Sequence, residues 1–292
     1  MDGLEHGELD AGGSAVRPGI GGEGLAGDSL KRALLPTKSM LEEVGDMMVL
    51  TGKTISSALR PPYPYGGEFV SQFLFTLRIC WLPLLVSTFA ISYGAAGLQA
   101  ANILNLLGNL DRLGGFFVLA AVREIGPIIT AVMIAGAAGT AITADLGARK
   151  IREELDALQV LGVDTVKNLV VPRFLALMIA TGLFNIYAIL FGLFGGVLAA
   201  VVNHQALGPF WVTFFANTST TDLWGSTLKT MVFGAIIAIV CCYKGMSASG
   251  GAEGVGRAVN QAVVAAFLAV GMFNYVFTQM LLATHPNLLS IR

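Results

Sequence analysis

The chain has 292 residues, of which 54% are hydrophobic and 13% are charged, and its formal net charge is −1 at pH 7. Together with a mean hydropathy of +0.71, this composition excludes a water-soluble globular domain. It predicts an all-α polytopic membrane protein. We expect no nucleic-acid partner.

Residues 1–38 begin with a glycine-rich, acidic stretch in which Arg17 is the lone basic residue before Lys31. The stretch has no basic start followed by an apolar core, so it is not a secretory signal. A low content of apolar residues is typical of disordered chain. We therefore expect a disordered cytoplasmic tail over 1–38.

Residues 39–62 differ from the tail because their apolar side chains can share one face of a helix. Arg60, Pro61 and Pro62 would end that helix. An amphipathic helix directly before the first membrane span is expected to lie among the lipid headgroups; a cytoplasmic helix packed against protein is the alternative. The apolar face comprises Met40, Leu41, Val44, Met47, Met48, Ile55, Ala58 and Leu59.

Five apolar stretches follow, and each approaches the ~20 residues that cross a ~30 Å hydrocarbon layer. The first contains Arg78 and Pro83, so a re-entrant hairpin broken at Pro83 is the alternative to a full span. The third is uncharged from Phe174 to Val202. We place the five spans near residues 73–93, 116–144, 170–202, 228–243 and 258–283.

Lysine and arginine side chains near the span ends predict the orientation, because cytoplasmic loops carry the excess of positive charge. With the N-terminus inside, twelve of these side chains face the cytoplasm and two, Arg112 and Arg292, face outward. We therefore expect a cytoplasmic N-terminus and an external C-terminus. The twelve are Lys31, Arg32, Lys38, Lys53, Arg60, Arg149, Lys150, Arg152, Lys167, Arg173, Lys244 and Arg257.

The segment ARKIREELDALQVLGV (148–163), between the second and third spans, contains six charged residues. Its apolar residues follow a helical period, and Gly162 is expected to end the helix. We predict a helix over 148–161 that lies along the cytoplasmic face and is pushed by a partner; a solvated helix without a partner is the alternative. The apolar stripe is Ile151, Leu155, Leu158 and Leu161, and the opposite charges four residues apart, worth about 0.2–0.5 kcal/mol each, are Arg149/Glu153, Lys150/Glu154 and Arg152/Asp156.

Arg123 and Glu124 lie inside the second span, where a charge costs several kcal/mol unless it is paired or hydrated. Adjacent residues project about 100° apart on a helix, so each of the two needs its own partner. Pro127 removes a backbone hydrogen bond and is expected to bend the helix. The three residues mark either a polar point in a transport pathway or an ion-pair network that holds helices in register.

Small residues predict close helix packing at Gly136 and Gly139 in the second span and at Gly192 and Gly196 in the third. Spacing alone does not decide whether they pack within the chain or against a second subunit. The uncharged polar residues inside the spans are expected to make interhelical hydrogen bonds. These are Asn185, Tyr187, Asn274, Tyr275 and Gln279.

We expect no cofactor site and no metal site in this chain. Gly52, Lys53 and Thr54 resemble the end of a phosphate-binding loop, but Met47 stands where GxxxxGK[ST] requires glycine. Any ATP would therefore be bound by another polypeptide. The cysteines and histidines form no metal-binding or disulfide pattern; they are Cys80, Cys241, Cys242, His6, His204 and His285.

Four runs of sequence carry a resemblance to a known family: REIGPIITAVMIAG (123–136), TAITADLGARKIREELDALQVLGVD (140–164), LVVPRFLA (169–176) and CYKGMSASGGAEGVGRAVNQAV (242–263). The first three resemble the MlaE/YrbE family, the permease subunits of ABC-type lipid transporters that work with MCE-domain proteins. The fourth is similar to the A-type YrbE subunit of actinobacterial Mce systems. The resemblance covers the chain from about Arg60 onward and implies a permease domain over 63–292.

This resemblance implies a function and a set of partners. The partners would be a B-type YrbE permease in a heterodimer, a cytoplasmic ABC ATPase that binds the ATP, and MCE-domain proteins on the outer face of the plasma membrane. The substrate would be a sterol or a fatty-acid or mycolic-type lipid, and the direction import. The helix that docks on the ATPase would correspond to Arg149, Lys150, Ile151, Arg152, Glu153, Glu154, Leu155, Asp156 and Leu158.

The sequence therefore favours a transport permease without catalysis of its own. Two alternatives remain at this point. One is an ion-coupled secondary transporter with Glu124 as the coupling site, although no inverted repeat of the kind usual in such proteins is visible. The other is an integral membrane enzyme that modifies lipids, which would need paired acids or a histidine cluster near one membrane face.

Overall fold

The computed structural model describes residues 22–61 and 65–284, with side chains described from Leu41 onward. All regular secondary structure in these residues is helical, which confirms the predicted fold class. Residues 1–46 and 47–292 form two separate units. The helical bundle lies in the second unit.

Helix α1 (Gly22–Leu59) begins before the predicted start at residue 39. Residues 22–38, which we expected to be disordered, therefore have helical backbone, whereas residues 1–21 of the predicted tail lie outside the described residues. The helix ends at Leu59, directly before the stop that Arg60 and the following prolines predict.

The part of α1 that belongs to the bundle unit has two different sides. Leu50 and Thr54 are buried, whereas Met48, Ile55 and Leu59 are exposed. One side therefore packs on the bundle and the other leaves an apolar stripe uncovered. The position of this segment among lipid headgroups stays a prediction.

Five helical runs among the described residues are long and apolar enough to cross a membrane, as the sequence predicted. The first run is one continuous helix, because Pro83 lies inside α2 without ending it; the re-entrant alternative is therefore wrong. Each predicted span lies within one run. The runs are Gly66–Leu106, Leu110–Ile151, Val166–Val202, Thr220–Met246 and Gly251–Thr284.

Three of the runs change helix type along their length. The first is made of α2 (Gly66–Ala90), the π-helix η1 (Ile91–Leu98) and α3 (Gln99–Leu106). The second is made of the 3-10 turn η2 (Leu110–Arg112), α4 (Leu113–Phe117), the π-helix η3 (Val118–Ile125), α5 (Gly126–Ile134), the π-helix η4 (Ala135–Gly139) and α6 (Thr140–Ile151). The third is made of the π-helix η5 (Val166–Val170) and α8 (Val171–Val202).

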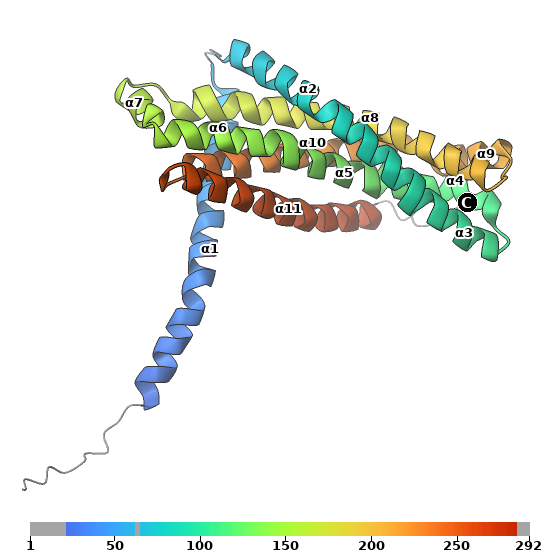
Figure 1. Cartoon of the computed structure of the whole chain (residues 1–292), viewed down its shortest axis with the longest axis horizontal. Helices are drawn as coiled ribbons and strands as arrows, with labels where there is room; N and C mark the ends of the chain where they lie inside the picture. Colours follow the sequence, from blue (N-terminus) through green and yellow to red (C-terminus); the bar gives the residue numbers. More distant parts are fainter. Residues whose placement is uncertain (1–21, 62–64, 285–292) are drawn as a thin grey trace, which may run out of the picture. The chain divides into compact units, whose positions relative to one another are not determined.

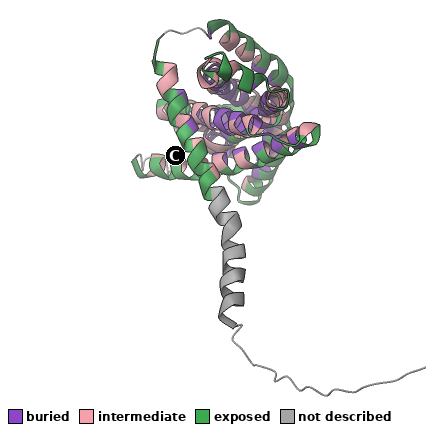
Figure 2. Cartoon of the chain, turned by 90° about the vertical axis from the view of Figure 1, so that its left-hand side faces the viewer, coloured by how far each residue is buried: buried purple, intermediate pink, exposed green. Residues whose placement is uncertain are grey.

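The remaining helices are α7 (Glu154–Val160), α9 (Leu207–Asn217), α10 (Thr220–Met246) and α11 (Gly251–Thr284). Figure 1 shows α7 at one end of the bundle and α3, α4 and α9 at the other. These are called the α7 end and the α9 end below. In Figure 2, the view onto the α7 end, buried residues lie in the middle of the bundle and exposed ones around its outside.

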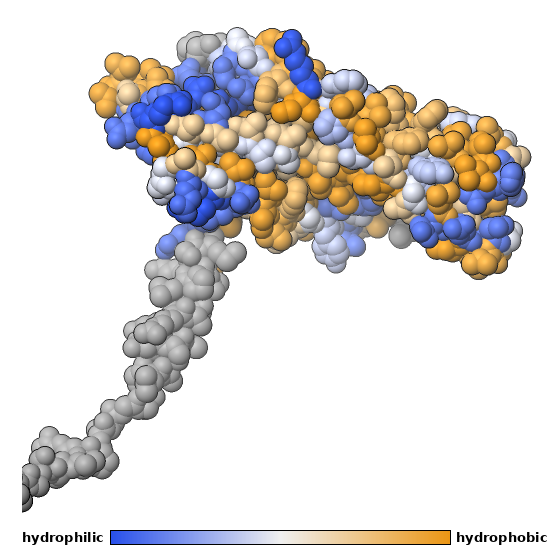
Figure 3. All heavy atoms as spheres, viewed as in Figure 1, coloured by the Kyte–Doolittle hydropathy of each residue, from blue (hydrophilic) through white to orange (hydrophobic). Residues whose placement is uncertain are grey.

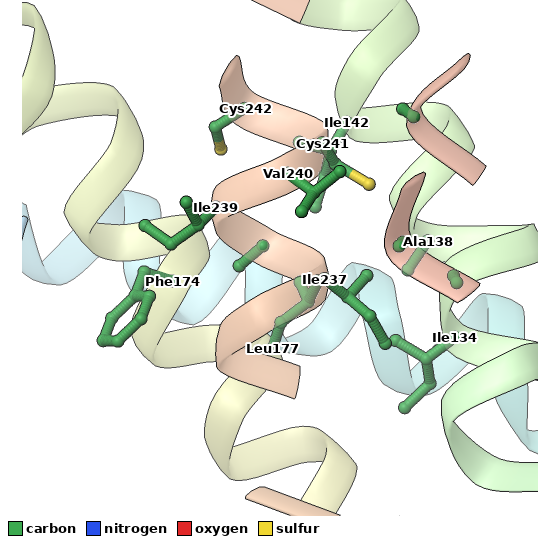
Figure 4. Close-up of a cluster of buried hydrophobic side chains, with 14 of the residues drawn as sticks. Ile134, Ala138, Ile142, Phe174, Leu177, Ile237, Ile239, Val240, Cys241 and Cys242 are labelled. Carbon is green, nitrogen blue, oxygen red and sulfur yellow. The ribbon is translucent and has the colours of Figure 1, made fainter. Parts of the chain in front are cut away.

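Most of the core lies where α6, α8 and α10 meet. Figure 4 shows Ile134, Ala138 and Ile142 from the second run approaching residues of α10, with Phe174 and Leu177 of α8 on the other side of that helix. Their side chains are buried. Small residues allow the close approach, because a Cβ atom added at Gly139 would lie 2.9 Å from the Cys241 sulfur.

A second apolar core fills the α9 end. Phe117 and Phe210 are fully buried there, and they pack with Ala101, Leu113 and Ala200. The first two runs contain 41 and 42 residues. At ~1.5 Å per residue they are about 60 Å long, twice the thickness of the ~30 Å hydrocarbon layer. Their extra length builds this second core, beyond the end of α11 in Figure 1.

Candidate functional site

The charged pair singled out in the second run lies in the π-helix η3 (Val118–Ile125). Gly126 and Pro127 follow directly and begin α5. A π-turn has a wider backbone than an α-helix and often occurs at functional sites. The wider turn also accommodates Pro127, which has no amide hydrogen to donate. A Cβ atom added at Gly126 would lie only 2.5 Å from the Ala121 carbonyl oxygen, so this turn requires glycine.

Arg123 is paired with a carboxylate of another span. Its Nε lies 2.7 Å from Asp222 Oδ1, and the Asp222 side chain is fully buried. The other Asp222 oxygen accepts hydrogen bonds from the Ser219 amide at 2.9 Å and the Ser219 hydroxyl at 2.8 Å. Asp222 therefore completes the capping box that Ser219 begins at the start of α10, and it neutralises Arg123 at the same time.

The Glu124 side chain contacts other residues than Arg123 does, as predicted from the ~100° between adjacent side chains on a helix. Its carboxylate lies 3.3 Å from Lys229 Nζ and accepts hydrogen bonds from Thr278 at 2.8 Å and Asn274 at 2.9 Å. Lys229 also donates to the Arg123 carbonyl at 2.6 Å. Asp222, Lys229, Asn274 and Thr278 thus join the two predicted residues, and we call these six residues the Arg123 cluster.

All residues of the Arg123 cluster except Asn274 line a small, partly open pocket of about 30 Å³ between the start of α10 and the last turns of α11. Apolar side chains of α11, including Phe277 and Leu281, form its other wall. The Glu124 side chain is 34% exposed, whereas that of Lys229 is 3% exposed. The site therefore combines balanced charges with an apolar wall, which suits an amphipathic ligand better than a free ion.

Asp222, Lys229 and Thr278 were not singled out from the sequence, although a signal was present. Asp222 and Lys229 are seven residues apart, and Asn274 and Thr278 are four apart, so each pair shares one face of its helix. The predicted interhelical hydrogen bonds also form at Asn185, which donates to Ser226 at 3.1 Å. The same helical periodicity therefore places all of these residues toward neighbouring spans.

At the α7 end, the predicted continuous helix over 148–161 is wrong. The helix α6 ends at Ile151, and Glu153 has a φ of 61°, a left-handed conformation that separates α6 from α7. The chain does turn at Gly162, whose φ is 75°, as predicted.

The break changes every predicted charge pair of the segment. Arg149 pairs with Asp145 at 3.2 Å, Lys150 with Asp156 at 2.8 Å, and Arg152 with Glu154 at 2.7 Å. The neighbouring Glu154 carboxylate raises the pKa of the Arg152 guanidinium. Side chains four residues apart are neighbours only on a continuous helix, so the break at Glu153 separates the predicted pairs.

The apolar residues of the segment are divided between core and surface. Leu155 is 3% exposed and Leu158 packs partly against the core, whereas Val160 is 88% and Leu161 76% exposed. Ile151 is also exposed. Figure 3 shows the resulting hydrophobic area over α7 beside hydrophilic residues. The exposed apolar surface is therefore formed by Ile151, Val160 and Leu161, not by the full predicted stripe.

Three of the four predicted packing glycines pack within the chain. A Cβ atom at Gly192 would lie 3.1 Å from the Ser92 hydroxyl, and one at Gly196 2.6 Å from the Phe117 ring. Gly139 faces Cys241, whereas a Cβ atom added at Gly136 would have no atom of another helix within 4 Å. Among the residues that the structure describes, no group of three histidine, cysteine or carboxylate side chains is placed to hold a metal ion.

Five helical runs that are long and apolar enough to cross a membrane, with ion pairs between them, define a multi-pass helical membrane protein. Comparison with known proteins gives the family: the model for the permease MlaE matches residues 69–280. The chain belongs to the MlaE permease family.

Named relatives agree with this assignment. A probable ABC transporter permease of Rickettsia bellii is 30% identical over 245 residues, which cover 84% of this chain and 94% of the relative. A probable ABC transporter permease of Synechocystis is 37% identical over 187 residues, 61% of this chain and 68% of the relative. The intermembrane phospholipid transport system permease protein MlaE of Haemophilus influenzae is 30% identical over 184 residues, 62% of this chain and 70% of the relative.

Proposed function

We propose that this chain is the membrane permease subunit of an ATP-driven lipid transporter and that its substrate passes the Arg123 cluster. The observation that carries the proposal is a charged, partly open pocket with an apolar wall inside the membrane spans of an MlaE-family permease. A charged group within a membrane span is a candidate functional site. The name of the Haemophilus influenzae relative, a phospholipid transport permease, supports a lipid substrate.

The proposed orientation places the α7 end in the cytoplasm and the α9 end outside. It rests on the excess of lysine and arginine at the α7 end. The proposed partners are a B-type YrbE permease, a separate ABC ATPase that binds the ATP, and MCE-domain proteins at the outer face of the plasma membrane. The proposed substrate is a sterol or a fatty-acid or mycolic-type lipid, which the system imports.

We assign the ATPase contact to α7 and its exposed apolar residues Ile151, Val160 and Leu161. Apolar anchors supply most of the affinity of an interface, and the charged rim mainly sets specificity. Leu155 is unsuitable as a test of this contact because it is buried in the chain's own core. The charged rim of the contact would be formed by Lys150, Asp156 and their neighbours.

The test is recovery of the ATPase with the purified chain. We expect Val160→Asp to reduce ATPase recovery at least tenfold, because a carboxylate would replace an apolar anchor. Leu106→Asp is the matched control: Leu106 is also 88% exposed but lies at the α9 end, so its recovery should equal that of wild type. Equal recovery with both variants would contradict docking at α7, and ATP hydrolysis by the isolated chain would contradict the function itself.

A further inference from the structure

A second group of charges lies toward the α7 end and is not part of the Arg123 cluster. Arg173, near the start of α8, is fully buried. Its Nη2 lies 2.7 Å from Asp145 Oδ2 of α6 and 3.6 Å from Glu68 Oε1 of α2. Its Nη1 donates to the Leu169 carbonyl at 2.9 Å. We call Arg173, Asp145 and Glu68 the Arg173 cluster.

The position of this cluster in the chain is unusual. Asp145 lies shortly before the end of α6, and Arg173 lies shortly after the start of η5 (Val166–Val170). The Asp145–Arg173 ion pair therefore closes the base of the loop that contains α7. The contact at this base is a charge-assisted hydrogen bond of 2.7 Å, which is a strong type of hydrogen bond.

Arg173 contacts its two carboxylate partners at different distances. The bond to Asp145 is short, whereas the 3.6 Å separation from Glu68 is too long for a hydrogen bond. The Arg173 Nε is buried and has no hydrogen-bond partner among the described residues. A guanidinium presents five donors in a fixed fork, so this arrangement leaves donors available to a carboxylate of α2. Glu68 and Asp145 are both partly exposed, and each also accepts a hydrogen bond from a residue of its own helix, Gln72 and Arg149 respectively.

We propose that Arg173 is the positioning residue that transmits movement of α7 to α2, by holding α6 through Asp145 and engaging α2 through Glu68. This inference rests on the proposed function. In the arrangement seen, α6 holds the guanidinium. A shift of the α7 loop would change the balance between the two carboxylates and so move α2 relative to α6. Buried ion pairs suit such a device because they favour discrete geometries over intermediate ones.

The experiment compares Glu68→Gln with Glu253→Gln in the complex of the full chain, its permease partner and the ATPase. Glu253 is the matched control because it also forms an ion pair, with Arg257 at 2.6 Å, on an exposed helix start. Three quantities are measured for each variant: ATPase recovery, ATP hydrolysis, and lipid moved per ATP hydrolysed. Arg173→Lys is included because it keeps the positive charge and removes the fork.

We expect Glu68→Gln and Arg173→Lys to keep ATPase recovery and hydrolysis within twofold of wild type and to move at least tenfold less lipid per ATP. Glu253→Gln should match wild type in all three quantities. Unchanged lipid per ATP in Glu68→Gln would overturn the inference, as would a loss of transport that only follows a loss of assembly. If wild type itself recovers no ATPase and moves no lipid, the proposed function fails and this inference fails with it.

Discussion

The Arg123 cluster and the Arg173 cluster solve the same physical problem in different ways. Each places an arginine away from water, and each neutralises it with an aspartate at 2.7 Å. The Arg123 cluster contains two complete ion pairs and borders an open pocket. The Arg173 cluster contains one short pair, one long pair and a buried donor, the Arg173 Nε, without a hydrogen-bond partner among the described residues.

The difference teaches that burial and charge do not identify a ligand site by themselves. A cluster beside a pocket has groups that a substrate can reach, and Glu124 is such a group. A cluster whose cation is fully enclosed, like Arg173, acts only on the helices that contact it. The same kind of interaction therefore suits recognition in one region and mechanical connection in the other.

The largest effect is expected from removing the aspartate of the Arg123 cluster. Asp222→Ala removes the carboxylate that is paired with Arg123, which costs about 3–5 kcal/mol, and it breaks one half of the capping box of α10, which costs about 1 kcal/mol at most. Thermal unfolding of the detergent-purified chain should show this loss. Asp145→Ala should cost less, because Arg173 keeps the Leu169 carbonyl and gains Glu68. A greater loss with Asp145→Ala would reverse the comparison.

A large effect on transport, with little effect on stability, is expected from Glu124→Gln. The amide keeps an acceptor for Thr278 but loses the charge that faces Lys229. Lipid transport in proteoliposomes should fall about tenfold or more, equivalent to about 1.4 kcal/mol per factor of ten. Assembly with the ATPase should remain at the wild-type level. A variant that is degraded or fails to assemble would show that the Arg123 cluster serves only to hold helices together.

A moderate loss of stability is expected from adding a side chain at Gly126, beside the π-helix that contains Arg123 and Glu124. Gly126→Ala places a methyl group against the Ala121 carbonyl and should destabilise the chain by about 1–3 kcal/mol. Gly136→Ala is the control in the same span, because no atom lies within 4 Å of the added group, and it should stay within about 0.5 kcal/mol of wild type. Thermal unfolding measures both, and equal stability of the two variants would contradict the π-turn.

No effect on stability is expected from two cysteine variants that report which cluster lies nearer the cytoplasm. Ala216→Cys in α9 should react with a membrane-impermeant thiol reagent on intact cells, and Ala157→Cys in α7 only after permeabilisation. The three native cysteines are buried and should not interfere. Ser219 is left intact because it caps α10. The opposite labelling pattern would place the Arg173 cluster on the outer side.

The sequence predicted the fold and part of the site. The parts that it did not predict have physical reasons. Long uncharged runs locate spans reliably because a hydrocarbon layer requires them, but they do not show how far a helix continues beyond the layer, so Leu106 and Ile151 were not foreseen as ends. Arg123 and Glu124 were found because charge inside a span is costly.

Other parts were not predictable from local pattern. Arg173 was counted among the cytoplasmic charges because it lies near the start of the third predicted span, and its ion pairs depend on Asp145 and Glu68 from other helices. The break at Glu153 was hidden because its neighbours have good helix propensity and regular charge spacing. Tertiary contacts, which a single sequence does not display, decided both.

The most direct test of a substrate pathway at the Arg123 cluster is photocrosslinking of lipid in the reconstituted transporter. A photoreactive amino acid replaces Leu281, which lines the pocket, or Leu268, which is on the exposed surface of the same helix. Lipid adducts at position 281 should change several-fold with ATP and fall in the Glu124→Gln background, whereas adducts at position 268 should not change. Adducts at position 281 that respond to neither ATP nor Glu124→Gln would contradict the account.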